Sequence, residues 1–98
     1  MAENKLKVFR NKLLRIDEKL IELLDERAGI SEEIGRLKFS EKIKIEQNEF
    51  WEQSTLIRQK IINRTHLDMN LSNRIFQLIQ KQSVRIQKGT AKKMQHEQ

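Results

Sequence analysis

The sequence predicts an all-α protein built around one very long N-terminal helix that pairs with a second copy of the chain. Apolar residues recur at alternating steps of three and four across residues 5–38, a pattern typical of a long amphipathic helix. The chain has no proline and three glycines, which argues against the tight turns of a β-sandwich or barrel. Its hydrophobic fraction is 37%, and a chain of this size buries only about 60–65% of its unfolded surface. A deep private core is therefore not expected.

The first helix is predicted over residues 5–38. At 1.5 Å per residue, a helix of this length spans about 50 Å, whereas a compact domain of similar size has a radius of gyration of about 13 Å. Two shorter helices cannot cover such a rod on all sides, so we expect a homodimer in which two long helices pack along each other. The apolar seam consists of Leu6, Phe9, Leu13, Ile16, Leu20, Leu23, Ile30, Ile34 and Leu37, and it has Arg27 at one position.

Two shorter helices are predicted over residues 46–63 and 69–88. The polar stretch between them ends at Asp68, which is placed to cap the third helix. Residues 89–98 have little apolar content and are predicted to form a flexible basic tail. The whole chain, 1–98, is expected to form a single domain.

Composition narrows the chemistry that the chain can perform. It has no cysteine, which removes disulfides, thiol catalysis and cysteine-based zinc sites. Its two histidines, His66 and His96, cannot make a histidine-rich metal site. No apolar run reaches the roughly 18–20 residues of a membrane span, and the N-terminus has no signal-peptide core. We therefore expect a soluble, cytoplasmic protein with no metal and no membrane contact.

The net charge of +6 indicates an anionic partner. Acidic and basic residues interleave over residues 15–49 instead of clustering on one face, which argues against nucleic acid. Arg27 stands in the apolar seam between Leu23 and Ile30, and a cation that faces a core must be paired or must bind an anion. Two explanations of Arg27 stay open at this point: a salt bridge to a carboxylate of another helix, and an anion site inside the bundle.

Other polar residues occupy bundle-facing positions. Lys38 follows Arg27 by eleven residues, about 16 Å along a helix, and two long side chains can hold one small ligand over that distance. The alternative for Lys38 is a solvated lysine at a helix end. Ser83 and Gln87 are four residues apart and share one face of the third helix. Gln47 takes a similar place in the second helix.

Arg10 precedes Arg27 by seventeen residues, about 25 Å along the same helix. The two arginines of one chain therefore cannot hold the same small molecule. In an antiparallel-type dimer, Arg10 would reach the pocket of the partner, which predicts sites shared across the interface.

Three segments resemble the all-helical (type II) chorismate mutases: LLRIDEKLIELLDER at 13–27, EEIGRLK at 32–38 and IFQLIQKQSVRIQ at 75–87. The resemblance extends over about residues 6–88. It implies an intertwined homodimer of three-helix subunits with two equivalent active sites. It also implies the rearrangement of chorismate to prephenate, toward phenylalanine and tyrosine, with no metal and no cofactor. The substrate-contacting pattern of the family falls in order on Arg10, Arg27, Lys38, Ser83 and Gln87.

The resemblance also implies a role for each of these residues. Arg27 would bind a substrate carboxylate, and Arg10 would enter the partner's site as a second carboxylate ligand. Lys38 and Gln87 would contact the ether oxygen of the breaking bond, and Ser83 the ring carboxylate. Such a site holds a flexible dianion in its reactive conformer and stabilises the negative charge that develops on the ether oxygen.

The second helix departs from the family pattern. Many members carry an arginine where this chain has Phe50, and some carry a glutamate at Trp51 that meets the ring hydroxyl. A subgroup has glutamine and tryptophan at the positions of Gln47 and Trp51. Gln47 is therefore the expected hydroxyl partner, Trp51 a packing residue or pocket wall, and Phe50 a residue that fills core volume.

Two alternative functions remain at this point. Isochorismate-pyruvate lyase resembles the mutase in fold, charge pattern and substrate, although Gln87 and the complete first-helix motif favour the mutase. The second alternative is a mutase-like helical dimer that binds its ligand and catalyses weakly or not at all, which Phe50 alone supports.

Overall fold

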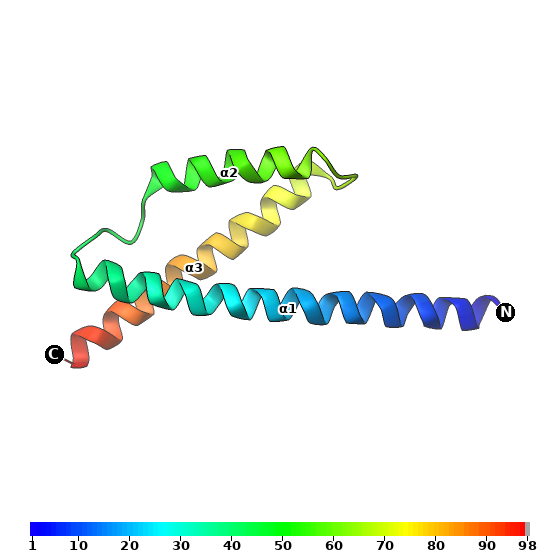
Figure 1. The fold of residues 1–98 in the computed structure, drawn as a ribbon, viewed down its shortest axis with the longest axis horizontal. Coiled ribbons are helices and arrows are strands. Elements are labelled where there is room, and N and C mark those ends of the chain that lie inside the picture. The colour runs from blue at the N-terminus through cyan, green and yellow to red at the C-terminus, as the bar shows by residue number, and fades with distance from the viewer. Residues whose placement is uncertain (98) are drawn as a thin grey trace. The chain divides into compact units, whose positions relative to one another are not determined.

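The computed structural model describes residues 1–97, which form three α-helices and no strand (Figure 1). These are α1 (Ala2–Ser40), α2 (Asn48–Ile62) and α3 (Met69–Glu97). The predictions of an all-α fold and of a very long first helix are confirmed. None of the described helices is both long and apolar enough to cross a membrane.

The chain divides into two compact units, Met1–Ile30 and a second unit that begins at Ser31. The first unit is helix throughout from Ala2 onward, and its apolar seam is exposed, with Leu13 and Leu23 at 59% and 60%. The second unit contains the end of α1 together with α2 and α3. The single domain predicted over 1–98 stays a prediction.

The end of α1 is closed by its own backbone. Lys42 adopts a left-handed conformation with φ 56°, and the Ile43 N–H donates to the carbonyl oxygen of Lys38 at 2.8 Å. The Lys42 N–H donates to the carbonyl of Phe39. This pair of bonds is the Schellman motif, which satisfies carbonyls at the end of a helix. The motif turns the chain sharply just after Lys38, one of the predicted site residues.

The helices α2 and α3 are joined by a short polar loop and diverge from it (Figure 1). The Arg58 guanidinium lies 4.6 Å from the ring centroid of Trp51 and 5.1 Å from that of Phe76. Cation–π contacts of this kind contribute roughly 0.5–1 kcal/mol each at exposed positions. Arg58 therefore links Trp51 of α2 to Phe76 of α3.

The third helix begins as predicted and ends later than predicted. The Asn70 N–H donates to Asp68 Oδ1 at 2.9 Å, which confirms Asp68 as the N-cap. The predicted end at Lys88 is wrong, because α3 continues to Glu97. Residues 90–97 contain no proline and are mostly good helix formers, and Thr90 is buried beside Gly35. Tertiary contact thus carries the helix past Gly89. The last residue of the predicted tail, Gln98, lies outside the described residues.

Within one chain the buried side chains are mostly polar and the large apolar side chains are exposed, the reverse of an ordinary globular domain. Of the described residues, Ile62 is the hydrophobic side chain that is buried, whereas large apolar side chains are exposed on all three helices. Interiors normally select apolar residues. The buried polar residues are Ser31, Ser72, Ser83, Gln87 and Thr90.

Candidate active site

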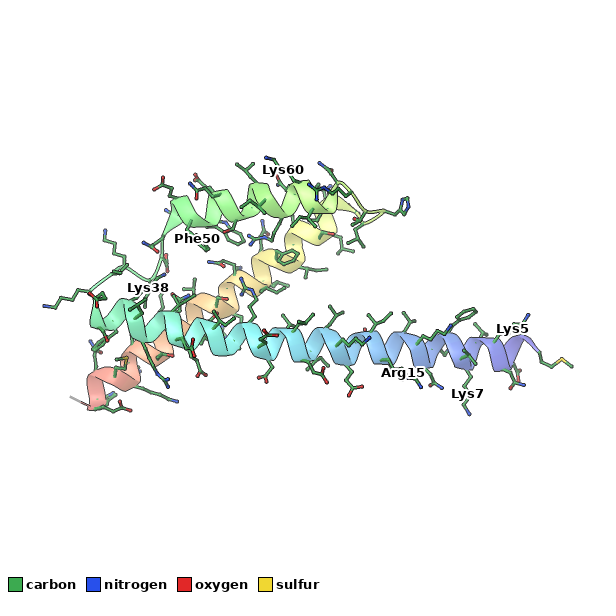
Figure 2. All side chains as sticks on the ribbon, in the orientation of Figure 1. Lys5, Lys7, Arg15, Lys38, Phe50 and Lys60 are labelled. Carbon is green, nitrogen blue, oxygen red and sulfur yellow. The ribbon has the colours of Figure 1, made fainter. Side chains whose placement is uncertain are left out.

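A lysine and a glutamine meet where the end of α1 approaches α3. The Lys38 Nζ donates to Gln87 Oε1 at 3.1 Å and to the carbonyl oxygen of Ile45 at 2.6 Å. Lys38 is half-buried near the C-terminal end of α1 (Figure 2), and this burial lowers the pKa of its ammonium from the ordinary value. Lys38 is therefore held by two acceptors, rather than extending into solvent.

The contact with Lys38 also orients the Gln87 amide. Because Oε1 accepts a hydrogen bond from Lys38, the Nε2 hydrogens of Gln87 are the donors that can meet another acceptor. Gln87 is only 6% exposed, so its amide acts in surroundings where an electrostatic interaction is stronger than in water. The two side chains together present an ammonium and an amide donor, which suits an oxygen atom that gains negative charge.

The approach of the two helices depends on a glycine. A Cβ at Gly35 would lie 3.0 Å from Gln87 Cα and 3.1 Å from the Gln87 carbonyl oxygen. One turn earlier, Ser31 donates a hydrogen bond to Ser83 at 3.1 Å, and both side chains are buried. Gly35 thus allows the close contact that brings predicted site residues of α3 to the end of α1.

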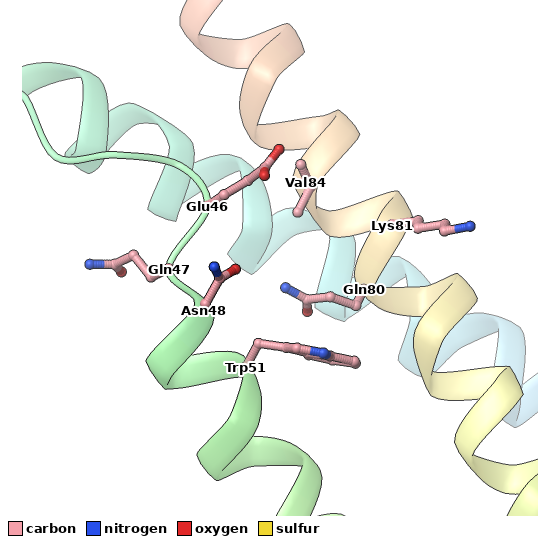
Figure 3. A pocket seen from close by; sticks show the side chains of 7 residues that line it. All are labelled: Glu46, Gln47, Asn48, Trp51, Gln80, Lys81 and Val84. Carbon is pink, nitrogen blue, oxygen red and sulfur yellow. The ribbon is translucent and has the colours of Figure 1, made fainter.

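A pocket of about 290 Å³ lies between the start of α2 and the middle of α3. Figure 3 shows Asn48 and Gln80 extending toward each other beside the Trp51 ring, whereas Gln47 borders the pocket and extends away from them. The lining consists of Glu46, Gln47, Asn48, Trp51, Gln80, Lys81 and Val84.

This pocket adjoins the Lys38–Gln87 pair. Ile45, whose carbonyl accepts from Lys38, directly precedes the pocket residue Glu46. On α3, Val84 lines the pocket three residues before Gln87, and residues at that spacing share a helix face. Lys38 and Gln87 do not line the pocket themselves, but residues next to their contacts do, so we group the donor pair and the pocket as the candidate site of the unit that begins at Ser31.

An ion pair stands at the rim of this site. The Lys88 Nζ lies 2.9 Å from Glu46 Oε1. The hydrogen bond from Lys88, and then the charge of the same ammonium, hold the pKa of Glu46 below its ordinary value. Both side chains are largely exposed, so the pair contributes little to stability. It does compensate the one carboxylate of the pocket lining.

The two predicted arginines belong to the unit Met1–Ile30. Arg27 is half-buried, and that burial lowers the pKa of its guanidinium, although arginine remains charged at ordinary pH. Arg10 is exposed. Their part in the site stays a prediction, as do the substrate contacts of Ser83 and Gln47.

Phe50 does not fill core volume within one chain, and its packing in the predicted dimer stays a prediction. Phe50 lies near the start of α2 (Figure 2) and is 66% exposed. Sequence reasoning also missed residues that the structure brings to the site: Ser31, Gly35, Asn48, Gln80 and Val84. Ser31 and Gly35 precede Lys38 by seven and three residues, so the helical repeat alone could have placed them on its face.

The fold and the site together describe an all-helical protein with an ammonium–amide donor pair beside a small pocket. Residues 9–88 match the family model of chorismate mutase type II, which covers most of the chain. The chain therefore belongs to the chorismate mutase type II family, and the resemblance seen in the sequence is confirmed. No curated protein and no solved structure gave a match.

Proposed function

We propose that this chain is a chorismate mutase that rearranges chorismate to prephenate in phenylalanine and tyrosine biosynthesis, in the cytoplasm. The observation that carries the proposal is the Lys38–Gln87 pair, in which an ammonium and a buried amide lie 3.1 Å apart. The reaction is intramolecular: the ether C–O bond breaks, a C–C bond forms, and no proton is transferred. It requires no nucleophile, metal or cofactor.

The donor pair accounts for the electrostatic part of the catalysis. Negative charge develops on the ether oxygen as its bond to carbon lengthens, and donors fixed in advance stabilise that charge without reorganising. Lys38 supplies the ammonium, and Gln87 supplies the Nε2 hydrogens left by its contact with Lys38. A fixed pocket also restrains the flexible substrate to its reactive conformer, which removes part of the entropic barrier.

The two carboxylates of the substrate need further partners. Ser83 and Arg27 are proposed to bind them, together with Arg10 from a second copy of the chain. Gln47 is proposed to meet the ring hydroxyl. Each assignment follows the pattern of the family on this sequence, and Ser83 has the support of a buried position on the same face of α3 as Gln87.

The proposed homodimer is supported by the exposed seam of α1. Leu13, Leu20 and Leu23 are each more than half exposed within one chain. Burying a leucine contributes about 1.5–3 kcal/mol, and a second copy supplies a matching apolar face along the helix. In this arrangement each site is completed by a residue of the other chain.

The test is to incubate the purified full chain with chorismate and follow the loss of chorismate and the appearance of prephenate. We expect prephenate without added metal or cofactor. A parallel reaction with isochorismate distinguishes the lyase: pyruvate from isochorismate, with no prephenate from chorismate, would reject the mutase. An inactive parent that Phe50→Arg activates would favour the weakly catalytic dimer.

A further inference from the structure

The buried hydrogen bond between Ser31 and Ser83 differs from the other hydroxyl contacts in the helices. Ser54, Thr55 and Thr90 each donate to the backbone carbonyl four residues earlier in their own helix, which is the usual local choice for a helical hydroxyl. Ser31 instead donates across to Ser83, 52 residues away, at 3.1 Å. The two side chains are 4% and 5% exposed.

This bond is one of three contacts in a matched register. The face of α1 presents residues 31, 35 and 38, and the face of α3 presents residues 83, 87 and 90, so both helices use steps of four and three. Ser31 bonds to Ser83, Gly35 packs on the Gln87 backbone, and Lys38 bonds to the Gln87 amide. Each proposed substrate ligand of α3 is therefore held by a donor from α1.

The two donors act on their partners in the same way. Lys38 occupies the oxygen of the Gln87 amide, and Ser31 occupies a lone pair of the Ser83 hydroxyl. A serine side chain has three staggered rotamers. The hydrogen bond from Ser31 favours the Ser83 rotamer whose oxygen accepts it.

We propose that Ser31 is a positioning residue, which holds the Ser83 side chain in the rotamer that meets a substrate carboxylate. The inference rests on the proposed mutase function and extends it to a residue that does not contact the substrate itself. A donor held in place before the substrate arrives binds without reorganising. Because a carboxylate contact is the same in the ground state and the transition state, its loss raises KM and leaves kcat nearly unchanged.

The experiment measures kcat and KM for chorismate in the full chain and its variants. In Ser31→Ala we expect KM to rise about 3- to 10-fold, the effect of one hydrogen bond, with kcat changed less than about 2-fold. Ser31→Cys retains the volume and supplies only a weak donor, so it should raise KM in the same direction even if the alanine variant is poorly folded. Ser72→Ala, which removes another buried serine of α3, is the matched control and should leave both constants unchanged.

A double-mutant cycle separates positioning from simple packing. In a Ser83→Ala background, Ser31→Ala should have no further effect on KM, because the residue through which it acts is gone. An equal rise of KM in both backgrounds, or an unchanged KM in both Ser31 variants of an active parent, would overturn the inference and leave the mutase standing. A parent without turnover of chorismate would overturn the proposed function and this inference with it.

Discussion

The two units of the chain expose and bury opposite kinds of side chain. In Met1–Ile30, residues 1–26 are all exposed, and the leucines of the seam are among them. In the unit that begins at Ser31, the buried side chains include Ser31, Ser83 and Gln87. The first unit has an apolar face that the described residues leave exposed, and the second brings buried polar side chains into the candidate site. An exposed apolar face and a cluster of buried polar residues therefore lie in different lengths of the same sequence.

The largest effect should come from a charge in the exposed seam. We expect Leu20→Asp to abolish the dimer, most of the helical circular dichroism and the activity. The substitution removes about 1.5–3 kcal/mol of stabilisation per chain, because the leucine side chain is no longer buried. It also places an unpaired carboxylate in the interface, which is destabilising. Sedimentation and circular dichroism measure this. Lys19→Asp puts the same charge beside the seam and should be tolerated. Since Leu20 is 53% exposed in one chain, a harmless Leu20→Asp would show that the chain functions alone.

The next effect concerns the donor pair of the second unit. Lys38→Ala should lower kcat by about 10²–10³-fold, the range for removing one oxyanion donor, while the helices remain formed. Lys60→Ala, at an exposed lysine of α2 (Figure 2), is the control. Steady-state kinetics with chorismate and circular dichroism give the two readouts. Turnover of Lys38→Ala close to that of the parent would refute the proposed mechanism.

Two glycines of α1, one in each unit, provide a matched pair. A Cβ at Gly35 would meet Gln87 backbone atoms at 3.0 and 3.1 Å, whereas a Cβ at Gly29 meets nothing within 4 Å. Gly29→Ala should stabilise the protein by up to about 1 kcal/mol through helix propensity. Gly35→Ala should destabilise it by about 1–3 kcal/mol through overpacking and lower the activity, because the helices must separate at the donor pair.

Thermal unfolding at one fixed protein concentration tests both glycine variants, since the stability of an oligomer depends on concentration. If Gly35→Ala is as stable and active as Gly29→Ala, the close helix approach does not position the site.

The smallest effect near neutral pH should be that of pH itself. The ammonium of Lys38 is the active form, and burial lowers its pKa from 10.5. The value of kcat/KM should therefore be constant around neutrality and fall as pH rises through this lowered pKa. Gln87 does not titrate, so it contributes no acid limb. A profile of kcat/KM against pH measures this, and a steep loss of rate close to neutral pH would contradict the assignment of these two residues.

Much of the fold could be read from local sequence signals. The seam of the first helix, the N-cap at Asp68 and the presence of two further helices depend on residues within a few positions of one another, and the structure agrees with them. The predicted boundaries missed by three residues at the start of α1, by two at its end and at the start of α2, by one at the end of α2, and by nine at the end of α3. The large error arose because Thr90 packs at Gly35, a contact that no local pattern around Gly89 reports.

The site was predictable in part. A lysine and a glutamine at bundle-facing positions were evident from spacing and from the resemblance to the family. Three features could not be predicted from the sequence. They are the direct hydrogen bond between Lys38 and Gln87, the hydrogen bond from Lys38 to the Ile45 carbonyl, and the pocket beside Trp51. The Lys38–Gln87 contact joins residues 49 apart, and helical periodicity extends only along one element.

Local sequence patterns establish that this protein is helical, that its apolar surface lies along a seam too long for one small chain to cover, and which polar residues interrupt that seam. These properties follow from the repeat of 3.6 residues and from composition. How these polar residues meet one another depends on the packing of the helices. Gly35 lets two helices approach closely, so Ser31 reaches Ser83 and Lys38 reaches Gln87. The reason is physical: hydrogen bonds form only within about 3.2 Å, and the distance between helices depends on packing across the whole unit.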